Sequence, residues 1–542
     1  MIKKIVSILL CVVIAALTFS ACSHDEELNI IYPISADPEC VDPQIAENDT
    51  ALIVAKNCME GLVRLDGDGK IQPGAAESWS VSDDGMTYTF NLRQDAKWQM
   101  LKAHKVFLGE DCLETFDNRV KADDFVFGIT RALRPETKAK YAYLLYCING
   151  AEKLNAGQLN EKELGISAVD DYTIKITLNR KNDDFLRILT MPMCMPCCRE
   201  FFEATKAKYG LELKYTLFNG PFYIGKWASD SSLTLFKSEV YKGDTSVKTN
   251  AIYLYINTDE DLYLSKFRQG DYNVVSLTDS GLSKVENNKE SSFFDIYNRT
   301  YGFSFNCADP LISNDNLRKA LVTATDLSVL DNSENNIAGG IIPDSCRFGD
   351  KSFREMAGTA FVPKPDKNKA FEYYEKALAE LDSGNISLSV VCPEEYRTDV
   401  IRILQNWEKI FGLSMSVSAS ALSKEELDKS FADKSYQIAF NCIEAESSDP
   451  LVFLKYFCEE NERNIWSYSD KDYQDIIDYC VKNASGDSYY KKMIEAENTL
   501  ISNGVFYPVY KAKTSFGYLN ELEGVFCSEN NRVIDFTLRG IK

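Results

Sequence analysis

Histidine is nearly absent from this chain, and the short motifs of the common enzyme classes are missing. Only His24 and His104 occur in 542 residues. There is no Gly-x-Ser-x-Gly, no His-Glu-x-x-His, no phosphate-binding P-loop and no dinucleotide-binding glycine pattern. A Ser–His or Cys–His catalytic pair would have to use His104. Carboxylates for acid–base chemistry are abundant, but no pair is singled out, so the sequence does not predict an enzyme.

Positive charge is also in short supply. Lysine and arginine number 60 against 81 aspartates and glutamates, which leaves a formal net charge of −21. So acidic a chain is repelled by phosphate backbones, and we expect no nucleic-acid partner. With 45% hydrophobic residues the chain can still bury sizeable cores. No repeat, low-complexity tract or long linker interrupts it, which predicts a globular protein with interleaved domains.

Long apolar runs are absent except at the N-terminus. Two lysines precede an apolar run over residues 5–19, and two small residues then precede Cys22. This layout is typical of a secretory signal peptide, residues 1–21, and the run is shorter than the roughly 20 residues of a membrane span; an uncleaved anchor is the alternative. The surroundings of Cys22 resemble a bacterial lipoprotein cleavage site, although Phe19 stands where leucine is usual. We therefore expect an extracytoplasmic protein, anchored to the bacterial cell membrane through lipidated Cys22.

Cysteine is plentiful, but its spacing shows no compact disulfide framework. Of 16 cysteines, Cys11 lies in the signal peptide and Cys22 would be lipidated. Export favours disulfides among the others, whereas a chain of this size does not need them. Free buried thiols are at least as well supported, and both states stay open at this point.

The most informative stretch lies between residues 60 and 133. Asp66–Gly69 and Asp83–Gly85 have turn chemistry, because glycine adopts positive φ cheaply and aspartate bonds its own backbone. Residues 86–93 alternate between apolar and polar side chains, which is typical of a half-buried strand. From Ala122 onward, apolar residues recur at helical spacing behind two aspartates, which suit a helix N-terminus.

The motifs in this stretch, and their order, resemble those of a known family. Glu60–Val63 (Glu-Gly-Leu-Val), Pro73–Trp79 (Pro-Gly-Ala-Ala-Glu-Ser-Trp), Asp83–Phe90 and Ala122–Phe127 are similar to phrases of the extracytoplasmic solute-binding proteins of family 5. These proteins are the peptide-binding receptors of ATP-driven importers. Asp42-Pro43 resembles the Leu-Asp-Pro that follows the first strand in this family.

The resemblance implies an α/β fold with two lobes. It is the large three-domain variety of the type II periplasmic-binding-protein-like fold, with mixed sheets and interleaved domains. Lobe I would comprise residues 22–59, 166–275 and 507–542, a peripheral domain residues 60–165, and lobe II residues 276–506. Residues 99–119 exceed the handful that the family has there, so we expect a surface insertion, which contains His104.

In the C-terminal half, the pattern of apolar residues predicts helices and strands that alternate along the chain, as in α/β architecture. A helix is expected to bury Phe371, Tyr374, Leu378 and Leu381 on one face. Further expected elements are strands at residues 301–306, 386–391, 413–418, 436–440 and 506–510, and helices at 316–324 and 399–411.

The candidate ligand site follows the predicted strand at Tyr436. In peptide-binding members of the family, that strand leads through Gly-Trp to an aspartate, four residues before a proline, which holds the peptide's α-ammonium group. Here Glu446 stands at the aspartate's position, and Cys442 and Ile443 replace Gly-Trp, so the aromatic wall is missing or comes from elsewhere. Glu444 and Asp449 compete for the same role, and a solvated loop acid is the alternative for Glu446.

The function implied by the resemblance is a monomeric receptor, without a cofactor, for peptides. It would capture an extended peptide between its lobes and deliver it to the permease subunits of an ABC transporter. Members of this fold also take nickel chelates, haem or oligosaccharides, so a non-peptide solute is the alternative. From a different class, a hydrolase is the remaining alternative.

Residues 191–198, Met-Pro-Met-Cys-Met-Pro-Cys-Cys, have the most unusual local composition. Thioethers and thiolates are soft ligands that hold copper and similar metals. The family has a short strand here, followed by a helix that we place at residues 199–209. We therefore favour a packed core strand over a metal site.

Overall fold

The structure is a computed structural model that describes residues 28–67, 69–243, 247–330, 337–348, 351–358, 364–445, 449–483, 486–522, 524–527 and 533–537. The predicted signal peptide, Cys22 and Glu446 lie outside the described residues.

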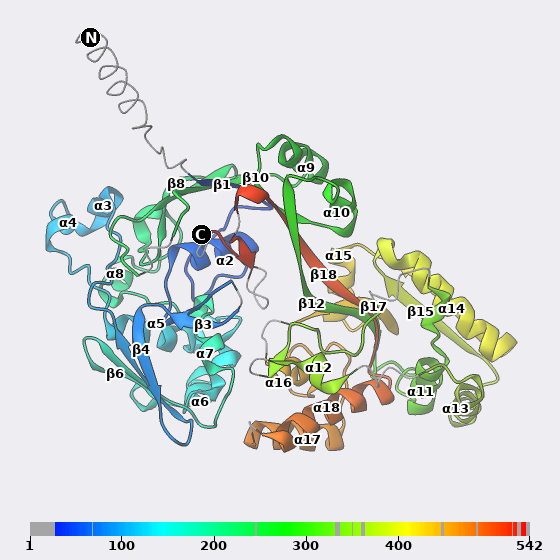
Figure 1. The fold of residues 1–542 in the computed structure, drawn as a ribbon. Helices are drawn as coiled ribbons and strands as arrows, with labels where there is room; N and C mark the ends of the chain where they lie inside the picture. Colours follow the sequence, from blue (N-terminus) through cyan, green and yellow to red (C-terminus); the bar gives the residue numbers. More distant parts are fainter. Residues whose placement is uncertain are drawn as a thin grey trace, which may run out of the picture.

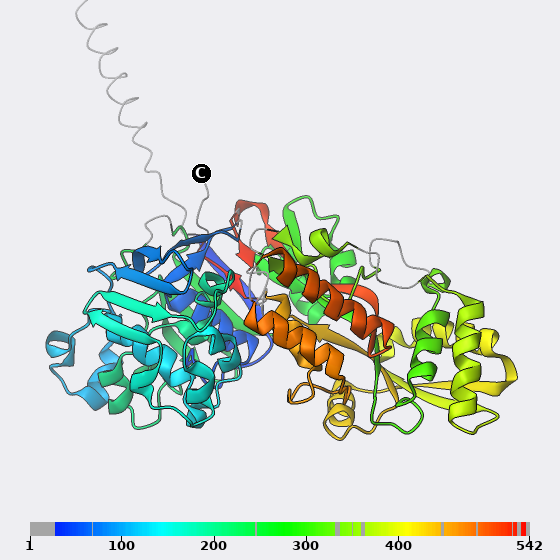
Figure 2. The same cartoon turned by 90° about the horizontal axis from the view of Figure 1, so that it is seen from below.

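Two lobes lie side by side, joined by two long strands (Figures 1 and 2). The strands are β12 (Ser291–Phe305) and β18 (Phe506–Leu519), which pair antiparallel along most of their length. Their pairing is interrupted between Ile296 and Arg299, midway along β12. This irregularity separates the part of β12 near lobe I from the part inside lobe II.

Lobe I is built on a four-stranded sheet in the order β1-β10-β9-β8. The strands are β1 (Asn29–Ile34), β8 (Phe222–Ala228), β9 (Ser232–Lys237) and β10 (Ala251–Ile256), and β1 and β10 run parallel. Helix α2 (Asp49–Cys58) begins behind Asn48, whose side chain accepts from the Ala51 N–H at 2.8 Å, a standard N-cap.

The peripheral part contains an antiparallel sheet in the order β4-β5-β7-β6. Its strands are β4 (Ala76–Val81), β5 (Thr87–Leu92), β6 (Ile166–Asp170) and β7 (Thr173–Thr177). Tyr88, Phe90 and Leu92 are buried, as the alternation predicted. The sheet continues past residue 165, where we expected the peripheral domain to end. Strand pairing therefore favours an end after Thr177, and the domain boundaries stay predictions.

The other elements of this half are short, apart from α5. They are β2 (Val63–Leu65), β3 (Ile71–Pro73), α3 (Lys105–Leu108), α4 (Cys112–Thr115), α5 (Ala122–Ala132), α6 (Ala151–Asn155), α7 (Phe185–Ile188) and α8 (Arg199–Ala204). Asp124 caps α5 by accepting from the Lys121 N–H at 2.9 Å, and Trp98 Nε1 donates to the same carboxylate at 3.1 Å. Burial raises the pKa of Asp124 to about 7 despite these donors.

Lobe II is built around a six-stranded mixed sheet in the order β11-β18-β12-β17-β15-β16. Besides β12 and β18 it contains β11 (Val274–Leu277), β15 (Ile386–Cys392), β16 (Met415–Ala421) and β17 (Ile438–Glu444). Helices α9 (Glu260–Gln269) and α10 (Asp279–Val285) pack beside β11 at the lobe I end of this sheet. The other helices are α11 (Asp315–Ala324), α12 (Phe353–Ala357), α13 (Lys367–Glu380), α14 (Arg397–Phe411), α15 (Lys424–Ala432), α16 (Pro450–Leu454), α17 (Lys471–Lys482) and α18 (Asp487–Ser502). The two-residue strands β13 (Arg347–Phe348), β14 (Lys351–Ser352), β19 (Phe526–Cys527) and β20 (Ile534–Asp535) complete the fold.

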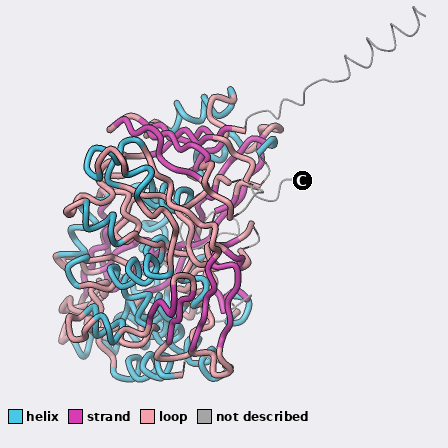
Figure 3. The backbone as a smooth tube through the Cα atoms, turned by 90° about the vertical axis from the view of Figure 1, so that its left-hand side faces the viewer, coloured by secondary structure: helices cyan, strands magenta, loops and turns pink. Residues whose placement is uncertain are grey.

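Helices and strands are intermixed through the whole molecule (Figure 3), so the predicted α/β class with mixed sheets is confirmed. Two hydrophobic clusters lie within lobe II. One contains Phe303, Phe440 and Trp407, and the other contains Ile443, Trp466 and Phe506. Phe440 and Ile443 of β17 therefore belong to different cores.

Several local predictions in lobe II were wrong. In α13, Tyr374 is buried as expected, and Leu378 and Leu381 pack partly buried against the same core, but Phe371 is 41% exposed. Ala370 and Ala377 complete the buried stripe in its place. Small residues let α13 approach α11 closely, which a search for large apolar side chains overlooks. The strand that we expected over residues 436–440 is β17, which begins at Ile438 and reaches Glu444 because β12 pairs with it that far.

The stretch from Met191 to Cys198 is buried, but it is not a strand. Pro192 begins a short 3-10 helix over residues 192–194, and proline lacks the N–H that a central strand needs. Helix α8 after it ends at Ala204 and not at residue 209. Burial raises the pKa of the Cys198 thiol to about 12, which disfavours a metal-binding thiolate.

The insertion at residues 99–119 folds into short helices and is only partly on the surface. His104 is fully buried, and its ring packs edge-to-face against the Phe201 ring with the two ring centres 5.1 Å apart. Burial lowers the pKa of His104 to about 4, so the imidazole is neutral. His104 is thus a core residue that fastens the insertion to α8.

Thirteen cysteines of the described residues take part in no disulfide, and ten of these thirteen are buried. Burial raises the pKa of Cys147, for example, to about 11. The expectation of free buried thiols is confirmed for these ten buried residues. None of the helices in the described ranges combines the length and the apolar composition of a membrane-spanning segment.

Candidate functional site

Strand β17 carries three of the predicted site residues into the middle of the molecule. It pairs antiparallel with β12, placing Cys442 opposite Tyr301, Ile443 opposite Thr300 and Glu444 opposite Arg299. The prediction that these residues follow the strand was wrong, because they are the last three residues of β17. A strand fixes their directions more firmly than a loop would.

The outer edge of β17 is only partly covered. Strand β15 pairs with it at two positions, Val390 with Ile438 and Val391 with Ala439. Strand β15 then ends at Cys392, before Pro393. From Phe440 to Glu444, β12 is the only strand neighbour of β17 within the described residues. This stretch is therefore an edge to which a further strand can be added.

The side chains of β17 alternate between the two faces of the sheet. Ile443 is buried in the cluster that also contains Leu451 of α16. Cys442 is half-buried, and Glu444 accepts from Asn298 Nδ2 at 3.3 Å. Ile443 thus packs in the core, while Cys442 and Glu444 lie beside the open edge.

Asp449 and the segment before residue 446 are held firmly. Asp449 is 7% exposed and caps α16 by accepting from the Leu451 N–H at 2.8 Å. Burial raises the pKa of Asp449, against the opposing effect of Arg180. Ala445 is buried and its N–H donates to the Asn298 carbonyl at 3.0 Å. Residues 446–448, between these two fixed points, lie outside the described residues.

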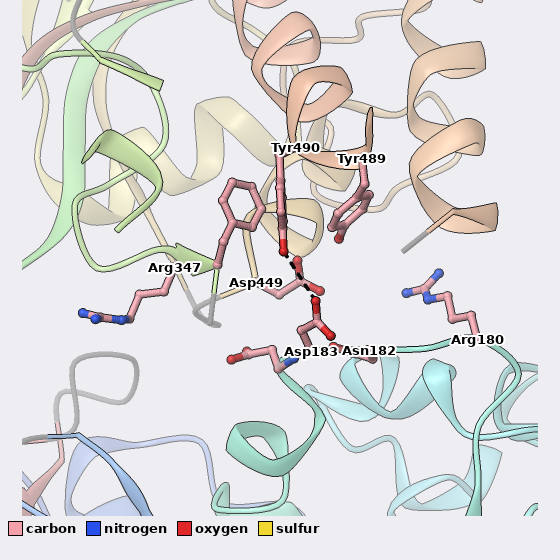
Figure 4. Close-up of a pocket in the computed structure, with 9 residues that line it drawn as sticks. Arg180, Asn182, Asp183, Arg347, Asp449, Tyr489 and Tyr490 are labelled. Carbon is pink, nitrogen blue, oxygen red and sulfur yellow. Dashed lines mark hydrogen bonds between the residues drawn. The ribbon is translucent and has the colours of Figure 1, made fainter. Parts of the chain in front are cut away.

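The two lobes touch on the side away from the crossing strands. Tyr490 of α18 donates to Asp183 at 3.4 Å, and Arg180 donates to the Val481 carbonyl at 3.3 Å. Figure 4 shows side chains of both lobes around a small pocket there, with Asp449 among them. Tyr143 and Tyr456 form a second bridge, with their hydroxyl oxygens 3.4 Å apart and Arg463 over both rings.

Sequence reasoning did not find this contact between the lobes. Arg180 and Asp183 lie about 300 residues from their partners, and each belongs to an unremarkable polar segment. No local spacing or motif marks such pairs, because only the folded chain brings them together.

A buried ion pair joins the start of lobe I to the peripheral part. Arg131 of α5 donates from both terminal nitrogens to Asp42, with one bond at 2.7 Å, and also contacts Gln44. The two charged side chains are 5% and 4% exposed. Asp42 belongs to the Asp42-Pro43 pair that resembles the family. Its ion pair with the buried Arg131 explains why an aspartate is needed at this position.

No metal site emerges from this geometry. The described residues contain no group of three or more His, Cys, Asp or Glu side chains that could hold a metal ion. The chemistry that the site offers is an open strand edge, acidic side chains beside it, and a contact between two lobes.

Comparison with known proteins agrees with the fold. The family model described as bacterial extracellular solute-binding proteins, family 5 middle, matches residues 70–464. Among curated proteins, the dipeptide-binding protein DppE of Bacillus subtilis is 27% identical over 485 residues, covering 88% of this chain and 85% of DppE. The oligopeptide-binding protein OppA of Bacillus subtilis is 25% identical over 507 residues, covering 91% of this chain and 89% of OppA.

Solved structures share the architecture. The substrate-binding domain of the oligopeptide ABC transporter from Bacillus anthracis str. Ames superposes with a TM-score of 0.73 at 25% identity. The superposition covers 95% of this chain and 98% of that one.

Proposed function

This chain belongs to the bacterial extracellular solute-binding proteins of family 5, and from that membership we propose that it captures peptides between its two lobes. In this proposal it then delivers them to the permease subunits of an ABC transporter. The protein works as a monomer outside the cytoplasm, without catalysis of its own. The relatives that match over nearly the whole chain are named for binding dipeptides or oligopeptides, which supports the choice of ligand.

The observation that carries the proposal is the open edge of β17. An extended peptide that pairs with Phe440–Glu444 forms backbone hydrogen bonds whatever its side chains are, since every residue brings the same N–H and C=O groups. Such pairing supplies affinity without a fixed sequence. Water in the side-chain pockets would let different residues fit.

Glu446 is the proposed partner of the peptide's amino terminus. It directly follows Ala445 and the edge strand, so a peptide paired with β17 can bring its first residue close to it. A carboxylate that receives an ammonium group in a water-excluded cleft makes a strong, charge-assisted hydrogen bond. Glutamate keeps the charge of the family's aspartate and is one methylene longer. In this arrangement Cys442 and Glu444 flank the ligand, and Ile443 supports them from the core side of the strand.

Closure of the lobes completes the proposed mechanism. The irregularity of β12 between Ile296 and Arg299 lies between the lobes and offers a place to bend. The contacts of Tyr490 and Arg180 then hold the lobes together on the opposite side. A ligand that touches both lobes favours the closed form by its differential affinity, and the transporter can select that form.

The proposed membrane attachment rests on Cys22 and the signal-like residues before it. The two acyl chains of a diacylglyceryl group on Cys22 would hold the receptor stably beside its permease. A mass increase confined to the N-terminal peptide of the processed protein would support this attachment.

Calorimetric titration with peptides of two to five residues tests the proposal. We expect binding of several unrelated sequences, with no cleavage of the peptide during the experiment. Binding of a nickel chelate, haem or an oligosaccharide in place of peptides would support the alternative receptor, and release of amino acids would support the hydrolase.

Replacing Asp449 with asparagine separates its structural role from ligand binding. Asparagine is as good an N-cap as aspartate, so the cap on α16 should survive. Because the folded-state pKa of Asp449 is raised, its charged form costs stability once the pH exceeds the unfolded value of about 4. We expect Asp449→Asn to be equally stable or up to about 1 kcal/mol more stable at pH 7, by urea denaturation.

The same variant should lose less stability than the wild type as the pH rises from 4.5 to 7. Its peptide affinity should stay within about twofold of the wild type, because Glu446 and not Asp449 receives the ammonium group. A drop in peptide affinity comparable to that of a Glu446 variant would move the role to Asp449.

A further inference from the structure

A cavity of about 550 Å³ lies in lobe II where β15 stops covering β17. Its residues come from β12, β17, the turn after β15 and helix α15. In Figure 1, α15, β15 and β17 lie beside the lobe II part of β12. A volume of this size accommodates a large amino-acid side chain.

The floor of the cavity consists of two cross-strand pairs. Arg299 of β12 lies opposite Glu444 of β17, and Tyr301 lies opposite Cys442. Arg299 donates to the Lys513 carbonyl at 2.7 Å and to Thr514 Oγ1 at 3.2 Å. The guanidinium is thus held against β18, and across the strand pair the negative charge of Glu444 opposes its positive charge.

The walls of the cavity combine apolar side chains with acidic ones. Leu422, Leu427 and Phe431 supply hydrocarbon and aromatic surface from the α15 side, and Tyr301 supplies a ring from the floor. Around them lie Glu394, Glu395, Lys424 and Asp428. Such a lining suits a side chain with an apolar stem and a charged head.

The acidic residues of the cavity outnumber its basic ones. Four carboxylates line it, from Glu394, Glu395, Asp428 and Glu444, against the two cations of Arg299 and Lys424. Arg397 lies 3.9 Å from Glu394 and offsets that charge. Glu395 and Asp428 have no ion-pair partner among the described residues, and they leave the cavity attractive to a cation.

We propose that this cavity binds the side chain of a lysine or arginine in the captured peptide, so that the receptor prefers peptides with a basic residue at one position. This inference rests on the proposed function. The alkyl stem packs against Tyr301, Leu427 and Phe431, and the charged head lies near Glu395 and Asp428. Because the cavity borders the open edge of β17, a side chain of a strand added there can enter it.

A positional series of pentaalanine peptides with a free amino terminus tests the inference. Lysine, norleucine or glutamate is placed at each position in turn, and affinities are measured by calorimetry. At one position we expect lysine to bind about tenfold more tightly than norleucine and glutamate to bind more weakly. In the variant Glu395→Gln/Asp428→Asn that preference should fall to about twofold or less.

Glu425→Gln provides a matched control, because it removes one exposed charge from the same helix without touching the cavity. It should leave the lysine preference unchanged. Both substituted acids are exposed, so the double variant should fold normally, which a thermal melt checks.

Each contrary outcome has a distinct meaning. Equal affinities of lysine and norleucine peptides at every position would overturn the inference while leaving peptide capture intact. Failure of every peptide to bind the wild type would overturn both. Tight binding of free 1,5-diaminopentane, with competition against the lysine peptide alone, would assign the cavity to a free polyamine instead of a peptide side chain.

Discussion

Replacing Glu446 with glutamine should lower the affinity for a peptide with a free amino terminus by about 100-fold, measured by calorimetry at pH 7. Glutamine keeps the size of the side chain and can still accept one hydrogen bond, but it cannot balance the charge of an ammonium group. An ammonium group enclosed between two lobes without a counter-charge has lost its water and gained little in return. Glu446→Asp should retain affinity to within about tenfold, since the charge is kept.

The matched controls separate this role from a general loss of negative charge. Glu444→Gln removes an acid two residues away, beside the same strand edge, and should have a much smaller effect on a peptide without basic residues. An N-acetylated peptide should bind the wild type weakly and should be insensitive to Glu446→Gln. Full affinity of Glu446→Gln, together with tight binding of the acetylated peptide, would show that Glu446 is not the partner.

Replacing Asp42 with alanine should destabilise the protein by about 3–5 kcal/mol. The substitution leaves Arg131 buried with its charge uncompensated, because Gln44 is its other hydrogen-bonding partner and is neutral. Arg131 lies against the rings of Phe202 and Tyr209, where water cannot replace the lost carboxylate. Urea denaturation followed by tryptophan fluorescence measures the change in the free energy of unfolding.

The double variant Asp42→Ala/Arg131→Met tests the cause. Removing both charges should recover a large part of the lost stability, because the desolvation cost of the guanidinium is then gone. If the double variant is as unstable as the sum of the two single variants, the loss comes from packing and not from an unpaired charge.

Local patterns predicted the elements that depend on local physics. The alternation around Phe90 identified β5, and the acids before Phe125 identified the start of α5, because one face of each element is buried. Patterns failed where packing partners decide the outcome. Ala370 and Ala377, not Phe371, face the core of lobe II, since close approach of two helices selects small residues.

The candidate site was only partly accessible to sequence reasoning. The family-like segment around Glu446 identified β17, but the edge left open by the end of β15 follows from pairing between strands 48 residues apart. The acidic cavity needs Glu395 and Asp428, which no motif connects. Contacts of this kind depend on tertiary structure, and each residue taken alone resembles an ordinary solvated acid.

The identity of the ligand that co-purifies with the protein tests peptide capture most directly. Receptors that enclose their ligand between two lobes release it slowly, so native mass spectrometry of protein taken gently from cells should show adducts of several different masses. After denaturation, tandem mass spectrometry should identify them as short peptides with free amino termini, enriched in lysine or arginine. A single adduct that is a metal chelate, a haem or a sugar would contradict the account.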